Sequence, residues 1–446
     1  MQNNSSQSRV HPFNSRYTMY ALQFFLVLAL LGAIWYIDPM GWRKTTTPTL
    51  TPQDATVYSS LTQIENLQAR LAQDQSNSRL QVELAGLYLQ YVREAGDPSY
   101  YTRADALLQK ALLADPNDLF AIIQLGNLAL ARHEFQDALA YGEHAARVNE
   151  RHWLAYGIIG DAQVELGNYN AARQAFDKMV SLRPDVNSYA RISYMRELLG
   201  DQKGAIQAMS MAMRVGLQTT ESSNWARVQL GHLYFNSGKL DQAEQLYKSS
   251  LELYPDYIHA LAGLGRVRAA RGDYAGAIRN YQKASRQIPI PEYVIALGDV
   301  YRAAGNTAEA DKQYKLVSAM QQLYNANGVD TDLELALFNA DHGIAPKETV
   351  AQARAAYETR PGIFAADVLA WALYQNGDYR AAQEFSNKAL ALGMQDALKY
   401  YHAGMIAFQL GDHAHARKHL ERALAINPHF SLRYAESARA TLAQAQ

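Results

Sequence analysis

The stretch NWARVQLGHLYFNSGKLDQAEQLYKSSLELYPDYIHALAGLGRVRAARGDYAGAIRNYQKASRQIPI (224–290) contains one pattern twice. In each copy a small residue is followed after seven positions by a glycine and after five more by an alanine: Gly231, Gly238 and Ala243, then Gly265, Gly272 and Ala277. A glycine in the middle of such a segment predicts two helices joined by a tight turn, because glycine adopts left-handed backbone without steric cost.

The same pattern extends through most of the chain. Eight glycines in Gly-polar turns form a ladder with a spacing of 33 to 38 residues: Gly167, Gly200, Gly238, Gly272, Gly305, Gly343, Gly377 and Gly411. Small residues before these glycines and alanines after them allow two helix backbones to approach closely, and proline closes several units. The sequence therefore predicts an all-α solenoid of helix pairs.

This pattern resembles the tetratricopeptide repeat family from about residue 78 to 430. The resemblance implies a right-handed α-α superhelical solenoid over 78–429, followed by a C-terminal capping helix over 430–446. Two intervals of 38 residues predict either a change of superhelix pitch or a division into subdomains. We expect about ten units, starting near residues 78, 119, 153, 186, 224, 258, 291, 329, 363 and 397.

A narrower resemblance concerns four stretches. They are LAGLYLQYVREAGDPSYYTRADALL (84–108), ARHEFQDAL (131–139), LELALFNADHGI (333–344) and HAGMIAFQLGDH (402–413). They look like bacterial exported or membrane-anchored tetratricopeptide proteins of unassigned activity. This resemblance implies export and carries no catalytic residue.

The N-terminal region predicts a membrane anchor. Residues 19–37, MYALQFFLVLALLGAIWYI, lack charge, and as a helix they are long enough to span a bilayer after a short tail, 1–18. Tyrosine and tryptophan near both ends fit the two membrane interfaces. A cleaved signal peptide is the first alternative, disfavoured by the long apolar run without a small-residue cleavage site. A buried helix of a soluble domain is the second.

The topology follows from weaker signals. Arg9 and Arg16 precede the apolar segment, and Arg43 and Lys44 follow it, so the count of basic residues is tied. The absence of cysteine in 446 residues favours a non-reducing compartment for the rest of the chain. We expect a single-pass protein of the cytoplasmic (inner) membrane with its repeats on the extracytoplasmic, periplasmic side.

A linker region, 38–77, joins the anchor to the repeats. Its first part, RKTTTPTLTPQD (43–54), is rich in threonine and proline, which is typical of an extended tether. Leucine and isoleucine then recur at helical spacing and predict a helix over about 56–74. This helix caps the solenoid or forms a stalk. A short oligomerising coiled coil is the alternative.

Composition and motifs exclude several classes of protein. Without cysteine there are no disulfides, Cys-based zinc sites or iron–sulfur clusters, and a net charge of -1 gives no general drive toward nucleic acid. No phosphate-binding glycine loop, His-Glu-x-x-His motif or nucleophile elbow occurs. We therefore expect neither an enzyme nor a cofactor-binding protein. His413, His415 and His419 are weak metal candidates.

The concave groove is the stronger candidate. In the family, the first helix of each unit lines this groove, and exposed aromatic and charged residues there favour protein binding. The resemblance thus implies a scaffold or adaptor for other proteins in envelope assembly, secretion or export. Alternatives are a metal- or small-ligand-binding protein using 413–419 and a non-catalytic regulatory subunit of an envelope enzyme. The groove positions are Tyr194, Glu197, Trp225, His232, Phe235, His259, Arg266, Glu292, Asp299, Arg302, Trp371, Tyr374 and Tyr401.

Overall fold

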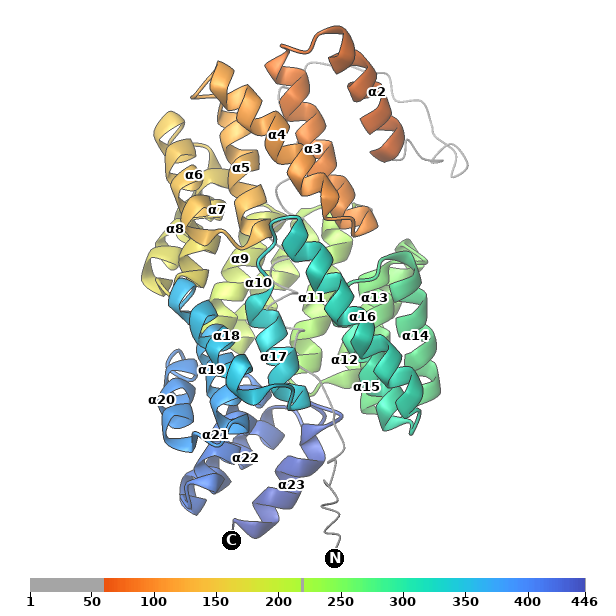
Figure 1. Cartoon of the computed structure of the whole chain (residues 1–446), viewed down its shortest axis with the longest axis vertical. Helices are drawn as coiled ribbons and strands as arrows, with labels where there is room; N and C mark the ends of the chain where they lie inside the picture. The colour runs from red at the N-terminus through yellow and green to blue at the C-terminus, as the bar shows by residue number, and fades with distance from the viewer. Residues whose placement is uncertain (1–59, 218–219, 446) are drawn as a thin grey trace, which may run out of the picture.

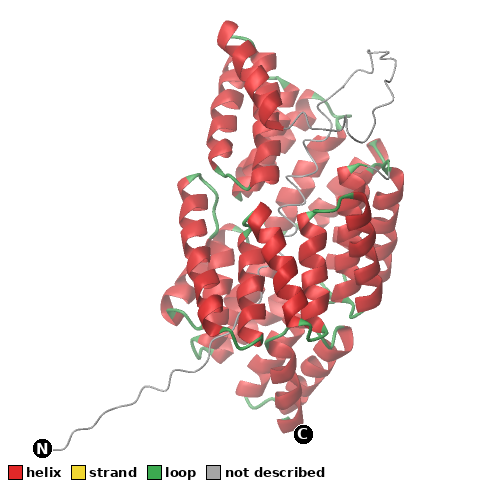
Figure 2. Cartoon of the chain, turned by 90° about the vertical axis from the view of Figure 1, so that its right-hand side faces the viewer, coloured by secondary structure: helices red, strands yellow, loops and turns green. Residues whose placement is uncertain are grey.

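The computed structural model describes residues 60–217 and 220–445, and all regular structure in these residues is helical (Figure 2). The predicted tail 1–18, the predicted anchor 19–37 and most of the linker lie outside the described residues. None of the helices in 60–217 and 220–445 is both long and apolar enough to cross a bilayer.

Within 60–217 and 220–445, ten helix pairs follow helix α2, and helix α23 comes after them (Figure 1). We number the pairs as units 1 to 10. The lone helices are α2 (Ser60–Gln73) and α23 (Tyr434–Gln444). The pairs are α3 (Ser78–Ala95) and α4 (Ser99–Ala114), α5 (Leu119–Arg132) and α6 (Phe135–Val148), α7 (Trp153–Glu165) and α8 (Tyr169–Leu182), α9 (Val186–Leu198) and α10 (Gln202–Val215), α11 (Glu221–Asn236) and α12 (Leu240–Leu253), α13 (Ile258–Ala270) and α14 (Tyr274–Gln287), α15 (Pro291–Ala303) and α16 (Thr307–Ala326), α17 (Asp332–His342) and α18 (Pro346–Thr359), α19 (Ile363–Gln375) and α20 (Tyr379–Ala389), and α21 (Ala397–Gln409) and α22 (His413–Ile426).

The predicted unit starts agree with the structure to within three residues. All eight predicted turn glycines have φ between +62° and +88°. The small residues bring the paired helices together as expected. A Cβ atom on Gly231 would lie 2.6 Å from the ring of Tyr247, which is fully buried between α11 and α12. The ladder is thus a packing pattern.

The superhelix completes one turn, and a second turn stacks on it. In Figure 1, α18–α22 lie directly below α5–α10. The turn inside each of units 1 to 5 contacts the loop that follows the unit five further along: Gly96 meets Ile288, His133 meets Asp330, Gly167 meets Pro361, Gly200 meets Gly393, and Gly238 meets Asn427. We call this row of five contacts the seam.

The seam includes directed hydrogen bonds. The Ile363 amide donates to the Tyr169 hydroxyl at 2.7 Å, and the Asn427 side-chain amide donates to the Phe235 carbonyl at 2.9 Å. The docking segments bury apolar residues, among them Ile288, Met394 and Ile363, the first residue of α19. These contacts fix the two turns in register.

The long helix α16 interrupts the regular stacking. It has 20 residues, whereas the second helices of units 2 to 6 have 14. Tyr324 near its end and Val329 beyond it pack into the core of unit 1 with Tyr101. Phe338 of α17 packs with Val317 of α16, so apolar contact continues into unit 8. The second 38-residue interval thus corresponds to a helix that reaches across to the first unit.

Both ends of the solenoid carry a helix. The predicted helix 56–74 is described over Ser60–Gln73, and Ile64 and Leu67 bury its apolar face in the core of unit 1. At the other end, Tyr434 and Ala438 of α23 join the core of units 8 to 10. Residues 430–433 of the predicted capping helix belong instead to the loop before α23.

Candidate partner-binding surface

All thirteen predicted groove residues lie on first helices of their units. Tyr194 and Glu197 lie on α9, Trp225, His232 and Phe235 on α11, His259 and Arg266 on α13, Glu292, Asp299 and Arg302 on α15, Trp371 and Tyr374 on α19, and Tyr401 on α21. Their role in partner binding stays a prediction. Partner binding also requires that these side chains be exposed to solvent.

The large aromatic residues of this set are buried, and the expectation that they are exposed is wrong for four of them. Trp225, Phe235, Trp371 and Tyr401 are each 1–2% exposed. A first helix packs against its own partner, against neighbouring units and, here, against the second turn or the C-terminal loop. Little of its surface therefore reaches solvent.

Trp371 shows how tightly these rings are held. It stacks on His402 at 4.1 Å and on Tyr374 at 4.6 Å between ring centroids. Its indole nitrogen donates to Asp341 Oδ1 at 2.9 Å, and the Tyr434 hydroxyl donates to the same oxygen at 3.0 Å. Two donors on one buried carboxylate tie units 8 and 9 to the capping helix, and the stacked His402 adds unit 10.

The loop 427–433 between α22 and α23, which we call the strap, lies against the inner face. Asn427 bonds to Phe235 of unit 5, and Leu432 packs on the core formed by α13–α16. Phe430 packs with Tyr401. The chain's own C-terminal segment therefore covers first-helix surface that we expected to be open to a partner.

Tyr194 and Glu197 are covered by the second turn. Tyr194 packs beside Ile363, at the start of α19, and Met394 of the loop after unit 9. Burial and then the nearby Asp396 raise the pKa of Glu197 to about 7, despite a hydrogen bond from Asn236. Both side chains are half-buried, so only part of each reaches solvent.

The remaining polar groove residues are bonded within the chain. His232 shares a 2.7 Å hydrogen bond with Tyr247, and burial lowers its pKa well below the usual value. Burial also lowers the pKa of His259, which is bonded to Tyr293, to about 4. Both imidazoles are neutral near pH 7 and serve packing.

The two carboxylates of α15 are buried, whereas the two arginines of the set are partly exposed. Glu292 and Asp299 are buried, and Asp299 accepts from the Tyr314 hydroxyl at 3.0 Å. Arg266 lies 3.9 Å from the Phe235 ring centroid, and Arg302 pairs with Asp311 at 2.6 Å. Arg266, Arg302, His259 and Tyr374 are half-buried, so part of each reaches solvent.

Sequence reasoning missed a buried charge cluster beside the seam. Arg360, after α18, pairs with Glu334 of α17 at 2.9 Å. Burial raises the pKa of Glu165 of α7 to about 7, although the Arg360 charge acts to lower it. On the same helix, Asp161 forms a buried pair with Arg191 at 2.6 Å. These residues lie in different units, so local spacing gave no signal for their meeting.

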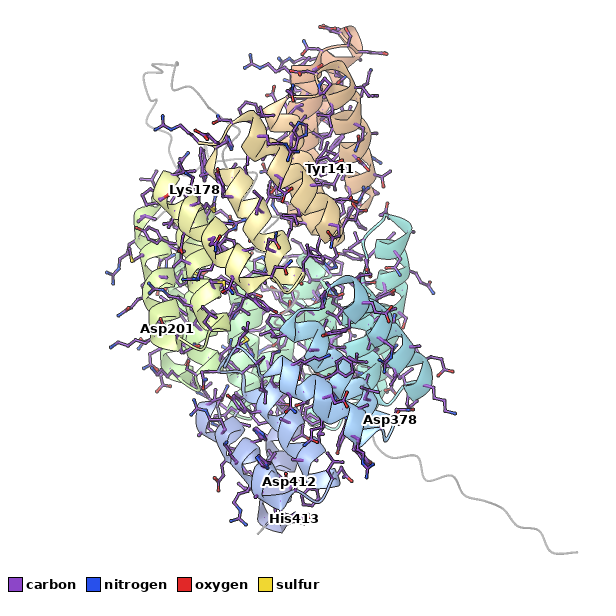
Figure 3. All side chains as sticks on the ribbon, turned by 90° about the vertical axis from the view of Figure 1, so that its left-hand side faces the viewer. Tyr141, Lys178, Asp201, Asp378, Asp412 and His413 are labelled. Atoms are coloured by element: carbon purple, nitrogen blue, oxygen red, sulfur yellow. The ribbon has the colours of Figure 1, made fainter. Side chains whose placement is uncertain are left out.

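The three C-terminal histidines lie at the outer end of the molecule. Figure 3 labels His413 and its neighbour Asp412 at the lower end of the ribbon. His415 Nδ1 is 2.8 Å from Asp412 Oδ2, and His419 lies beside the Tyr400 ring. In the described parts of the chain, no three His, Asp or Glu side chains are placed to share a metal ion. The predicted metal alternative thus gains no support.

Comparison with protein families identifies the repeats. Models described as "Tetratricopeptide repeat" match residues 123–187, 222–287 and 397–430. The chain is a tetratricopeptide repeat protein. The three matches fall on units 2–3, units 5–6 and unit 10.

Curated relatives match only in part. Anaphase-promoting complex subunit 7 of Arabidopsis thaliana is 26% identical over 203 residues, which is 46% of this chain and 36% of the relative. Lipopolysaccharide assembly protein B of Escherichia coli K12 is 25% identical over 254 residues, 52% of this chain and 61% of the relative. The chain thus spans less than two thirds of either relative's length.

Solved structures are similar to this chain with low TM-scores and low sequence identity. PilW, described as a widely conserved type IV pilus biogenesis factor, covers 46% of this chain and 93% of its own, with a TM-score of 0.38 and 17% identity. The Cut9-Hcn1 assembly covers 86% of this chain and 81% of its own, also with a TM-score of 0.38 and 17% identity.

Proposed function

We propose that this protein is a membrane-tethered scaffold that binds other proteins in bacterial envelope assembly, secretion or export. The observation that carries the proposal is a superhelix of ten repeat units whose two turns are fixed in register by the seam. Such a surface can hold partners at set positions without chemistry of its own. The names of two relatives, a complex subunit and an assembly protein, support the same role.

The tether is a separate part of the proposal. It rests on the uncharged apolar run 19–37 and on the threonine/proline-rich stretch that follows it. Anchoring raises the local concentration of the repeats near membrane-bound partners. Fractionation of cells tests this directly. The full chain is expected in the inner-membrane fraction, and a chain lacking residues 1–37 is expected outside it.

Because the strap and the second turn cover most of the predicted groove, the partner surface in this form consists of outer helix faces and free turns. The test is photo-cross-linking in intact cells with benzoylphenylalanine at single positions. Defined partners are expected from Arg173 and Asn376, which lie on the outside of α8 and in a free turn. Absence of any specific product at these positions and at half-buried Tyr374 would refute the scaffold role.

A further inference from the structure

A surface pocket of about 560 Å³ opens beside the seam. Three segments that are distant in sequence form it: the turn and start of α8, the end of α9, and Leu392 in the loop that docks from unit 9. We call it the seam pocket. Its volume lies in the range that proteins use for small ligands and for single inserted side chains. It is lined by Gln163, Gly167, Asn168, Tyr169, Asn170, Ala171, Arg173, Met195, Leu199 and Leu392.

The pocket offers an apolar contact at an accessible place. Met195 is buried and Leu392 half-buried, whereas Leu199 is 45% exposed. Leu199 directly follows α9, and its backbone amide bonds to the Met195 carbonyl. The helix end therefore fixes the leucine in place. An apolar side chain that entered the pocket would cover surface that is now in water.

The pocket also has unused hydrogen-bonding capacity. The Gln163 Oε1 atom is shielded from solvent and has no hydrogen-bond partner among the described residues. A buried acceptor of this kind calls for a donor from a ligand or from water. The Tyr169 hydroxyl is already engaged by the Ile363 amide and holds the wall in place. Gln163 lines the pocket and is half-buried, so a turn of its side-chain amide would present this acceptor to an incoming N–H group.

Charge narrows the choice of ligand. Arg173 is exposed, and it is the charged member of the lining set, which contains no aspartate or glutamate. The side-chain amides of Asn168 and Asn170 lie beside it in the sequence and also line the pocket. A carboxylate near the mouth would gain an opposite charge and neutral donors without facing a like charge.

We propose that the seam pocket binds a peptide segment of a partner protein through one large apolar side chain, one backbone N–H group and a nearby carboxylate. The apolar side chain would contact Met195, Leu199 and Leu392, and the carboxylate would lie near Arg173. The N–H group would bond to Gln163. The proposal rests on the scaffold function and assigns it a definite docking point outside the groove.

The test uses the full chain in detergent micelles with ¹³C-labelled methyl groups of methionine and leucine. The probes are acetyl-Ala-Leu-Ala-Asp-amide and two controls, in which Lys replaces Asp or Ser replaces Leu. The acidic leucine peptide is expected to shift the Met195, Leu199 and Leu392 methyl signals in a saturable way. Each control should bind at least about tenfold more weakly. Peptide is added to about 5 mM, because one apolar group and one ion pair support roughly millimolar affinity.

Two variants make the result specific. Leu199→Glu is expected to abolish binding and Arg173→Glu to remove the preference for the acidic peptide. Leu113→Glu is the matched control, since Leu113 is an 85% exposed leucine far from the pocket in sequence, at the end of α4. The proposed site would be wrong if the signals did not move, if the lysine peptide gave equal shifts, or if binding survived Leu199→Glu. If partners are still captured from cells with Leu199→Glu, the scaffold function stands and the pocket assignment fails.

Discussion

Gly200 and Gly393 lie so close across the seam that a Cβ atom on Gly200 would collide with the carbonyl oxygen of Gly393. The two residues belong to units 4 and 9, and no other unit separates them in space at this point. Gly272, in the corresponding turn of unit 6, has nothing within 4 Å of the place where its Cβ would be. Glycine is therefore required at position 200 by both its backbone conformation and close packing, and at position 272 by its backbone conformation alone.

This contrast predicts the effect of alanine. Gly200 and Gly272 have nearly equal φ, +78° and +80°, so alanine at either site costs about 1–2 kcal/mol for left-handed backbone. Gly200→Ala must also move a backbone carbonyl, which adds about 1–3 kcal/mol. Urea unfolding of both variants checks this difference. Equal losses of unfolding free energy would show that the seam does not constrain Gly200.

The hydroxyl of Tyr169 offers a second test of the seam. Tyr169→Phe leaves the Ile363 amide without its acceptor, and we expect a loss of about 1–3 kcal/mol. Tyr274→Phe is the matched control, because Tyr274 also begins a second helix but beside a free turn. Amide hydrogen exchange at Ile363 should accelerate in the first variant alone. Unchanged exchange would contradict the hydrogen bond.

The buried carboxyl group of Glu165 predicts a pH effect of definite sign. Its pKa is raised by burial from 4.5 to about 7, so the folded state holds this proton more strongly than the unfolded state. The group's contribution to stability is therefore full below about pH 4.5 and is lost as pH rises through about 7. Glu165→Gln removes this dependence while keeping the shape.

The measurement is the difference in unfolding free energy between Glu165→Gln and the parent chain at several pH values. We expect the variant's advantage to grow by about 1–3 kcal/mol between pH 5 and pH 8. The difference isolates Glu165 from the buried histidines, whose lowered pKa values act in the opposite direction. A difference that stays flat across this range would be inconsistent with a buried, proton-holding Glu165.

The shared carboxylate of Asp341 predicts how the C-terminal cap is held. Tyr434→Phe removes one donor from a carboxylate that is 1% exposed, and we expect a cost of about 1–3 kcal/mol. Hydrogen exchange of α23 and the strap should rise before that of units 1 to 4. Exchange that rises evenly along the chain, or not at all, would argue against this anchoring role.

The burial of Trp225 predicts that removing its side chain destabilises the protein. Trp225→Ala is expected to cost about 3–5 kcal/mol, because the side chain is 2% exposed in the core of units 4 and 5. Loss of partner binding in this variant would therefore report unfolding of the unit. Circular dichroism during thermal unfolding checks the expected drop in Tm, and a parent-like Tm would show that Trp225 contributes little to the core.

The repeat pattern predicted the helix pairs well because each pair is specified locally. A glycine such as Gly231 and an alanine such as Ala243 contact neighbours within one unit, so their spacing in the sequence predicts the helix pair. Unit starts and turn conformations followed directly. The tether and the partner role are untested by these features and stay predictions.

The seam and the strap could not be obtained from spacing, because they join a turn to the loop that follows the unit five further along. A signal was nevertheless present in the loops. Docking segments carry buried apolar residues, such as Ile288 in IPIP and Ile363, which begins α19, in PGIF, whereas the free loop at Pro255 and Asp256 is polar and exposed. The strap carries Phe430 in the same way. Apolar residues in a loop between units thus mark burial against a distant part of the chain.

Repeat proteins commonly change length by gaining or losing whole units, and the register of the seam restricts where this chain can do so. One extra unit inserted between units 4 and 5 would move the docking loops after units 6 to 9 one step away from the turns of units 1 to 4. The polar loop at 254–257 would then face a position now occupied by a buried isoleucine. Duplication beyond unit 10 would have to displace α23, which packs on the core of units 8 to 10.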